Sequence, residues 1–153
     1  MALYVSRIFS NEHIDKVFTI EASGIAFGFA VGSVLQVPMI FAKKSKAAID
    51  DNKCYSAAAH SFTHNTDFFA TVSVDFIKPS EKILIVDDFL ATGNAFEAMT
   101  EICNQAHAEI AGFVSIIEKG YQGGGDMLRK KGFKVESLAI IDSMSTDGTI
   151  IFR

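Results

Sequence analysis

Two adjacent carboxylates, Asp87 and Asp88, stand between a run of apolar residues and a turn of small residues. The apolar run, at residues 83–86, is typical of a fully buried parallel strand. Because open parallel sheets bind ligands at the carboxyl ends of their strands, we expect the pair to lie there. Two buried carboxylates repel each other and lose hydration, so hydroxyl donors or a metal ion should compensate them. Capping of the next helix by one Asp is the structural alternative.

The turn after the two carboxylates has the composition of a phosphate-binding site. It leads into a helical pattern, and a helix N-terminus offers backbone N–H groups and the positive end of a dipole. Small side chains leave these amides open, and Gly93 permits a close approach of the backbone. An ordinary strand-to-helix turn is the alternative. Beside two carboxylates, however, the turn indicates a ribose 5-phosphate. Its residues are Ala91, Thr92, Gly93, Asn94 and Ala95.

Two further clusters could contact anionic groups. Ser23 and Gly24 belong to a second small-residue turn, which follows an apolar segment at residues 16–21. A polar, lysine-rich stretch at residues 43–53 predicts a mobile loop, for which a merely solvated charged loop is the alternative. Lys119 follows an apolar segment at residues 110–117, so we expect it at the same sheet edge as the carboxylates. The lysines of the polar stretch are Lys43, Lys44, Lys46 and Lys53.

The cysteines, histidines and remaining glycines show no recognised motif. Cys54 and Cys103 lie far apart without metal-type spacing, which favours reduced cysteines in a cytoplasmic protein. The four histidines are scattered, so we predict no metal site built from side chains. The glycines at 123–125 lack the flanking residues of a Walker A or dinucleotide-binding motif.

Strands that alternate with helices must position these groups. The apolar patterns predict an α/β fold: a central parallel sheet flanked by helices, with one antiparallel hairpin. Gly24, Gly28 and Gly32 recur on one helix face and predict close packing of that helix on the sheet. One predicted helix follows Gly24, and further helices are predicted at residues 2–9, 96–106 and 127–131. The predicted strands are 16–21, 37–42, 83–86, 110–117 and 133–141, with a hairpin of 54–62 and 68–76 and an edge at 149–152.

Composition restricts the class of protein further. The 153 residues fit a single domain spanning 1–153. A net charge of −4 argues against a nucleic-acid surface. Residues 25–42 approach the length of a membrane span, but Ser33, Gln36 and Pro38 favour a buried helix followed by a buried strand. We therefore expect no nucleic-acid or membrane partner, and the N-terminus carries no secretory pattern.

Residues 86–93 resemble the phosphoribosyl pyrophosphate (PRPP) motif of type I phosphoribosyltransferases. Residues 20–25, 41–44, 61–63, 87–91 and 117–119 are similar to the xanthine-specific members of this family, and less so to the adenine-specific members. The resemblance extends over essentially the whole chain. It implies the type I phosphoribosyltransferase fold, in which a flexible loop and an antiparallel hairpin accompany the parallel sheet. Residues 1–14 do not match the family's N-terminal hood, so a reduced or missing hood is expected.

The resemblance also implies a role for each candidate residue. Asp87 and Asp88 would be the catalytic carboxylates that hold the ribose hydroxyls, and residues 91–95 would bind the 5-phosphate. Ser23 and Gly24 would receive the pyrophosphate. Lys43, Lys44 and Lys46 would begin a flexible loop that closes over it and keeps water from the sugar. Lys119 would contact an oxo group of the purine.

The implied reaction is transfer of 5-phosphoribosyl from PRPP to xanthine, with guanine or hypoxanthine as further acceptors, in purine salvage. Mg²⁺ would arrive chelated by the pyrophosphate of PRPP, and the protein would form a homodimer in the cytoplasm. Two alternatives remain open: a non-catalytic PRPP-binding regulator, and an inactive truncated homologue that retains PRPP binding.

Overall fold

The computed structural model describes residues 1–47, 53–61 and 66–153. Eight strands within these ranges form one sheet in the order β3-β4-β2-β1-β5-β6-β7-β8. The five central strands run parallel, as the apolar segments predicted. They are β2 (Met39–Ser45), β1 (Lys16–Ile20), β5 (Lys82–Leu90), β6 (Glu109–Lys119) and β7 (Val135–Met144).

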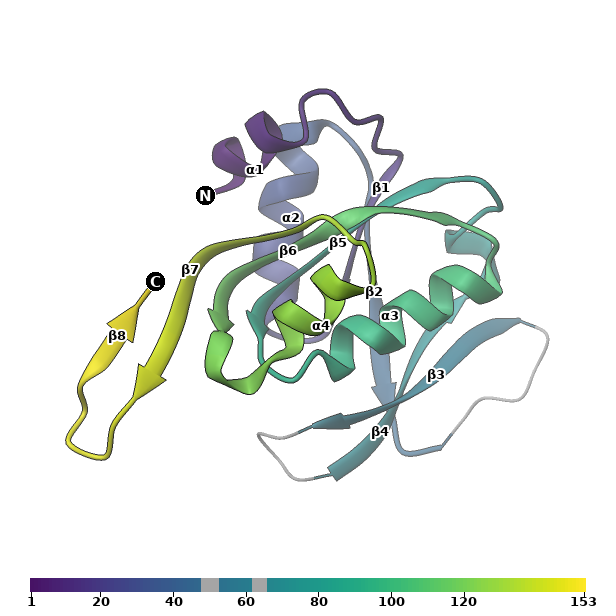
Figure 1. Ribbon diagram of the computed structural model, residues 1–153. Helices are drawn as coiled ribbons and strands as arrows, with labels where there is room; N and C mark the ends of the chain where they lie inside the picture. Colours follow the sequence, from purple (N-terminus) through teal and green to yellow (C-terminus); the bar gives the residue numbers. More distant parts are fainter. Residues whose placement is uncertain (48–52, 62–65) are drawn as a thin grey trace.

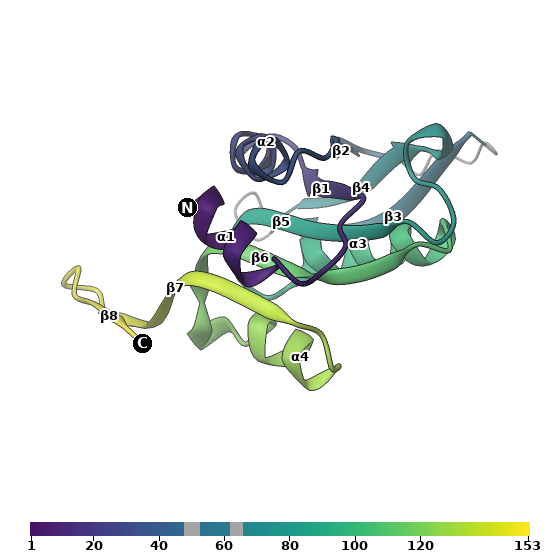
Figure 2. The same ribbon diagram turned by 90° about the horizontal axis from the view of Figure 1, so that it is seen from above.

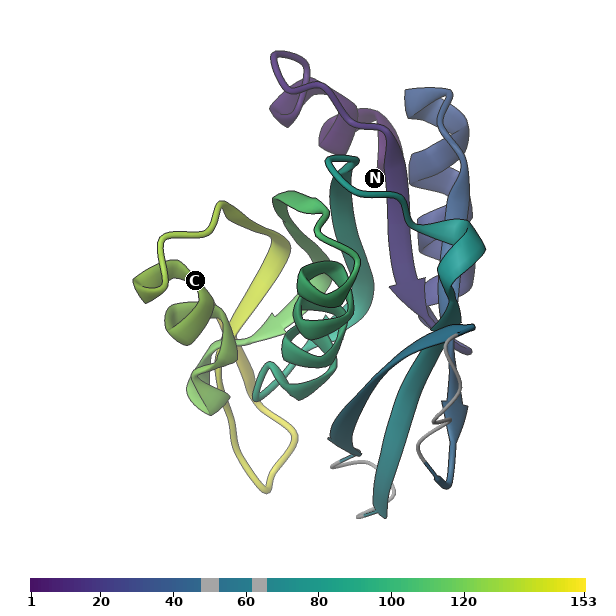
Figure 3. The same ribbon diagram turned by 90° about the vertical axis from the view of Figure 1, so that its right-hand side faces the viewer.

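Antiparallel strands extend the sheet at both sides. The predicted hairpin is confirmed as β3 (Cys54–Ser61) and β4 (Thr66–Ser73), with β4 also paired to β2. Figure 3 shows this hairpin reaching beyond the carboxyl end of β1. The predicted edge strand is confirmed as β8 (Ile150–Phe152), which pairs antiparallel with β7. The sheet therefore has two antiparallel edges, where the sequence predicted a single hairpin.

Helices cover both faces of the sheet (Figures 1 and 2). α1 (Ala2–Ile8) and α2 (Gly24–Leu35) lie on one face, and α3 (Asn94–Gln105) and α4 (Gly124–Lys130) lie on the other. Short 3-10 turns, η1 (Val74–Phe76) and η2 (Gly120–Gln122), follow β4 and β6. The predicted helices are thus present, and α4 begins earlier than its apolar residues indicated.

β5 contributes to two hydrophobic cores, one on each face of the sheet. Ile83 and Ile85 join the core that contains Phe96 and Met99 of α3. Leu84 and Val86 join the other core, which contains residues of α1 and α2. All four β5 side chains are fully buried, which accounts for the unbroken apolar run in the sequence.

The glycine face of α2 packs closely on the sheet, as predicted. A Cβ atom at Gly28 would lie 3.2 Å from Cγ2 of Thr19, and one at Gly32 would lie 3.3 Å from Cβ of Met39. Residues 25–42, weighed above as a membrane span, divide between α2 and β2, which confirms the helix-and-strand interpretation. In the described ranges, no helix has the length and apolar character needed to cross a membrane.

The strand order changes direction between β1 and β5. The chain runs from β1 through α2 to β2 on one side, and from β5 through α3 to β6 on the other. α2 and α3 begin at the carboxyl ends of adjacent strands and diverge onto opposite faces (Figure 2). Such a switch point leaves a crevice at the carboxyl ends, which is the usual ligand site of open α/β sheets.

Candidate active site

A cavity of about 740 Å³ lies at this switch point. The ends of β1, β5 and β6, the turn before α3, and parts of β2, β3 and β4 contribute to its lining. It contains most of the predicted site residues, although they come from widely separated parts of the chain. Those residues are Ser23, Lys44, Asp87, Asp88, Ala91, Thr92, Gly93, Asn94, Ala95 and Lys119.

The Asp pair lies within β5 near its carboxyl end, where the sequence predicted it. β5 continues through Asp87 and Asp88 to Leu90, and β6 pairs with it as far as that residue. Asp87 is 6% exposed, and its Oδ1 accepts the backbone N–H of Asp88 at 3.0 Å. The extension of the strand explains why the two neighbours have different surroundings.

The surroundings of Asp87 favour the protonated form of its carboxyl. Burial raises the pKa of its carboxyl, and the charge of Asp88 raises it further, to about 8. Protonation of Asp87 lowers the negative charge that the pair would otherwise carry. The site therefore avoids the full repulsion expected from two buried carboxylates.

The turn between β5 and α3 is shaped by its backbone. Gly93 adopts a φ of +94°, which suits glycine, and its carbonyl accepts the N–H of Glu97 at 2.8 Å in the first turn of α3. Asn94 begins α3, and its side-chain amide donates to the carbonyl of His60 at 3.4 Å. The N-terminal end of α3 thus faces the cavity, which is the arrangement that suits a phosphate.

The second small-residue turn lies directly against the first carboxylate. The Glu21–Ala22 peptide bond is cis, and α2 begins at Gly24. Gly24 does not line the cavity, but a Cβ atom there would overlap both Oγ1 of Thr19 and Oδ1 of Asp87. Oγ1 of Thr19 is buried and has no hydrogen-bond partner among the described residues. Only a residue without a side chain lets this turn approach the acidic pair so closely.

The lysine stretch differs from the predicted mobile loop. Lys43 and Lys44 belong to β2, and residues 48–52 lie outside the described ranges. Lys44 lines the cavity, where its Nζ lies 5.1 Å from the ring centroid of Phe68. Its backbone N–H donates to Oε1 of Glu21 at 2.6 Å. Lys43 and Lys46 are exposed and do not line the cavity, because neighbouring residues of a strand point to opposite faces and Lys46 follows its end.

The far end of the cavity combines a lysine with an aromatic ring. Nζ of Lys119 lies 5.4 Å from the ring centroid of Phe89, which is 45% exposed. Gln122 also lines this end. Tyr121 does not line the cavity, and its hydroxyl donates to Sδ of Met144 at 3.5 Å. This part of the cavity therefore brings an aromatic ring and a lysine together.

Several lining residues were not predicted as part of a site. Phe89 follows the acidic pair directly, and this position in the sequence could have indicated that it lines the cavity. Glu21 follows β1 directly, which was a similar signal. His60 was set aside as one of the scattered histidines, yet it lines the cavity and its Nδ1 lies 2.7 Å from Oδ1 of Asp67. The pairing of β3 with β4 brings it there, which single-sequence patterns do not reveal.

Known proteins are similar to this chain in sequence and in fold. The phosphoribosyl transferase domain family matches residues 1–145. The xanthine phosphoribosyltransferase of Lachnoclostridium phytofermentans is 42% identical over 148 residues, which are 96% of this chain and 76% of that protein. The xanthine phosphoribosyltransferase of Brevibacillus brevis is 45% identical over 143 residues, 94% and 73% of the two chains. The crystal structure of adenine phosphoribosyltransferase from Rhodothermus marinus has a TM-score of 0.76 at 23% identity, covering 92% and 77%.

Proposed function

Since this chain belongs to the phosphoribosyltransferase family, we propose that it transfers 5-phosphoribosyl from PRPP to xanthine in purine salvage, releasing pyrophosphate. The observation that carries this proposal is the cavity that joins an acidic pair, a phosphate-type turn and a lysine beside an exposed aromatic ring. Relatives named xanthine phosphoribosyltransferase at 40–45% identity support xanthine as the acceptor.

Each part of PRPP has a matching part of the cavity in this proposal. Asp87 and Asp88 accept hydrogen bonds from the ribose hydroxyls, and the backbone amides of residues 91–95 bind the 5-phosphate. Ser23, which lines the cavity at the start of α2, receives the pyrophosphate, and Gly24 allows this turn to lie against the acidic pair. Lys44 is the lysine of its stretch that lines the cavity, so we assign it to the pyrophosphate ahead of Lys43 and Lys46.

The acceptor base lies at the far end of the cavity in this arrangement. Phe89 offers a ring face for the purine, and Lys119 donates a hydrogen bond to an oxo group. A lysine has three donors and no acceptor, so this contact favours an oxo-purine over adenine, which presents an amino group there. Guanine and hypoxanthine share the 6-oxo group with xanthine, and are therefore weaker candidate acceptors.

Bond breaking separates charge between the ribose and the departing pyrophosphate. As the bond from ribose C1 to the pyrophosphate oxygen breaks, its electron pair leaves with pyrophosphate and positive charge builds on the ribose. Lys44 and the amides near Ser23 stabilise the departing anion, and the acidic pair stabilises the ribose. A purine ring nitrogen then supplies the electron pair of the new bond to C1, and its proton is released.

We propose that Mg²⁺ enters as a complex with PRPP. The acidic pair is the main oxygen donor set in the cavity, and no three His, Cys, Asp or Glu side chains gather as a metal cluster within the described ranges. Two carboxylates suit a metal that retains other ligands from water and substrate phosphates. When bound, the ion neutralises pyrophosphate charge. We also propose that the protein is a cytoplasmic homodimer, and the apolar side chains exposed on its surface support the dimer.

The decisive experiment is a turnover panel. Purified protein with PRPP and Mg²⁺ is expected to form nucleotide with xanthine, more slowly with guanine or hypoxanthine, and not with adenine. Nucleotide formation is measured by chromatography, and PRPP binding by calorimetry in parallel. PRPP binding without turnover of any purine would overturn the enzymatic proposal and favour a PRPP-binding regulator.

A further inference from the structure

The three glycines at 123–125, which no motif explained in the sequence, form the start of α4 beside the phosphate-type turn. The N–H of Gly124 donates to the carbonyl of Ala91 at 3.1 Å. A Cβ atom at Gly124 would overlap the backbone of Ala91, Thr92 and Gly93. The first residue of α4 therefore packs on this turn backbone against backbone, a contact that any other residue would prevent.

The next glycine meets a buried acid on β6. Glu118 has no exposed surface, and a Cβ atom at Gly125 would overlap its Oε1. Arg129, one turn further along α4, donates from Nη1 and Nη2 to the two carboxylate oxygens at 2.8 and 2.7 Å. Oγ of Ser137 on β7 donates to the same carboxylate at 2.5 Å. Such a paired, bidentate arrangement compensates the buried charge and fixes its geometry.

Glu118 and Lys119 are consecutive residues of β6, and their side chains lie on opposite sides of the strand. The Glu118 side chain is held by α4 and β7, whereas Lys119 lines the cavity. Because their side chains share one stretch of backbone, an anchor on Glu118 also fixes the position from which Lys119 extends. α4 thus contacts both ends of the cavity: the turn at residues 91–93 and the strand that carries Lys119.

We propose that Glu118 and Arg129 are positioning residues that, through the glycine-rich start of α4, hold Lys119 at a set distance from the phosphate-binding turn. A nucleotide or a bound pair of substrates spans this distance, with its 5-phosphate at the turn and its purine at Lys119. This role presupposes the phosphoribosyl transfer proposed above. Loss of the anchor should therefore weaken purine recognition more than recognition of PRPP.

The test compares Michaelis constants for the two substrates. Glu118→Gln and Arg129→Gln are expected to raise KM for xanthine at least about 10-fold and to change KM for PRPP less than about 3-fold. Arg129→Lys, which keeps the charge but loses the bidentate geometry, should recover part of the loss. Gly124→Ala, which acts on the turn itself, should raise both constants.

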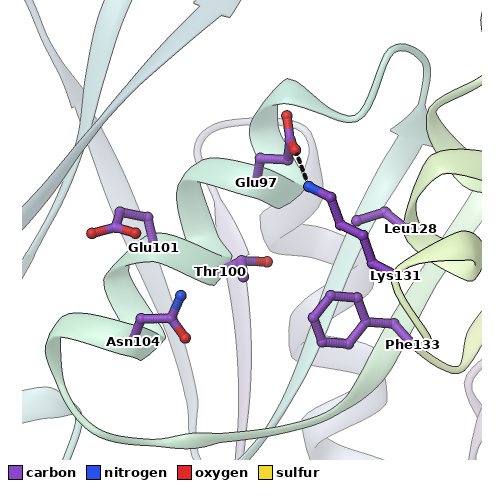
Figure 4. Close-up of a pocket in the computed structure, with 7 residues that line it drawn as sticks. All are labelled: Glu97, Thr100, Glu101, Asn104, Leu128, Lys131 and Phe133. Atoms are coloured by element: carbon purple, nitrogen blue, oxygen red, sulfur yellow. Dashed lines mark hydrogen bonds and ion pairs between the residues drawn. The ribbon is translucent and has the colours of Figure 1, made fainter.

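An exposed ion pair on the same helix end gives the matched control. Lys131 and Glu97 join α4 to α3 at 2.5 Å, beside a separate cavity of about 430 Å³ (Figure 4). Lys131→Ala removes a link between the end of α4 and α3 without touching Glu118, so both Michaelis constants should stay unchanged. Circular dichroism melts establish that each variant is folded.

The outcomes separate this role from simple stabilisation. A structural role alone would lower the folded fraction, and hence the apparent kcat, while both Michaelis constants stayed constant; that result would overturn the positioning role. Equal increases in KM for xanthine and KM for PRPP in Glu118→Gln would also overturn the positioning role. Absence of turnover in the unmodified protein would overturn the proposed function itself. If Glu118→Gln does not fold, Arg129→Lys and Ser137→Ala provide the same comparison.

Discussion

Asp87 and Asp88 are neighbours in sequence that stand in different surroundings. Asp87 is buried against the start of α2, whereas Asp88 is half-buried and donates its backbone N–H to the Asp87 carboxylate. The pair can therefore divide its roles in the proposed reaction, with one carboxyl neutral and packed and the other more accessible to the ribose.

Substitution of Asp87 should change how stability depends on pH. The pKa of Asp87 is about 8 in the folded protein, against an ordinary value of 3.8. Between these two pH values the folded state therefore binds more protons than the unfolded state. The free energy of unfolding should then fall as pH rises from about 4 to about 8. Asp87→Asn is expected to flatten this decline and add about 1–2 kcal/mol at pH 8.5. Calorimetric melts of the ligand-free protein from pH 5 to 9 measure it.

Exposed Asp75→Asn serves as the control for that experiment. The free energy of unfolding of Asp75→Asn should depend on pH in the same way as that of the unmodified protein. If Asp87→Asn also melts in parallel with the unmodified protein at every pH, the raised pKa of Asp87 is wrong.

Substitution of Asp88 should act on the ligand. Asp88→Asn removes a charged acceptor that we assign to a ribose hydroxyl, and hydrogen bonds to charged groups contribute about 1.5–3 kcal/mol. We expect PRPP affinity, measured by calorimetry with Mg²⁺, to fall at least about 10-fold. An unchanged affinity would show that the ribose is held elsewhere.

The residue chemistry near the acidic pair was largely predictable, because its groups follow one another along the chain. The sequence did not predict which of Lys43 and Lys44 lines the cavity, since this depends on where β2 ends. His60 reaches the cavity through strand pairing that involves residues far from the acidic pair in sequence. Contacts of this kind depend on tertiary structure, which local patterns do not contain.

At the scale of elements, α2 and β5 approach each other through Gly24. Gly24→Ala would drive a methyl group into Thr19 and Asp87, so either α2 or the acidic pair must move. We expect a loss of about 1–3 kcal/mol in the free energy of unfolding, as for other overpacked sites. PRPP affinity should also fall, because both proposed binding turns shift. Denaturant unfolding and calorimetry measure the two effects.

Gly28→Ala is the matched comparison for Gly24→Ala. It lies one turn along the same face, and its added methyl would meet Thr19 and Met39 side chains at 3.2 and 3.4 Å. A small adjustment accommodates that contact, and both variants gain similar helix propensity. Equal effects of the two substitutions on PRPP binding would contradict a special role for the start of α2.

The elements themselves were predictable where one pattern dominated. Residues 83–86 of β5 are fully buried on both faces, so they appeared as an unbroken apolar run, and the glycines of α2 indicated its packed face. The start of α4 was misplaced because glycine ordinarily disfavours helices, and only packing against residues 91–93 and Glu118 explains glycines there. β2 extends past its apolar residues because β4 pairs with Lys43 and Lys44.

At the scale of the whole molecule, apolar side chains remain exposed in several places, and one of them is a projecting region of the sheet. β8 and the end of β7 extend away from the rest of the sheet (Figures 1 and 2). Met144, Ile151 and Phe152 of this region are each more than half exposed. Exposed apolar groups of this kind are typical of surfaces that contact another protein, which supports the proposed homodimer.

A change at this region should alter the oligomeric state. Light scattering after gel filtration is expected to give a dimer for the unmodified protein. Ile151→Ser combined with Phe152→Ser should shift it toward the monomer, because the lost apolar contact outweighs small changes in folding. Tyr4→Ser, at the exposed and distant α1, is the control. A dimer that persists in the double variant would place the interface elsewhere.

The position of β5 also determines the order in which the protein can fold. β5 lies beside β1, with Lys16 opposite Ile83, although β2, β3 and β4 all intervene in the chain. Because β5 supplies side chains to both cores, neither core can close on a growing chain until residue 86 has left the ribosome. The β3–β4 hairpin is local and can form earlier. Pulsed hydrogen exchange should therefore detect protection in the hairpin before β1, and simultaneous protection of β1 and β5.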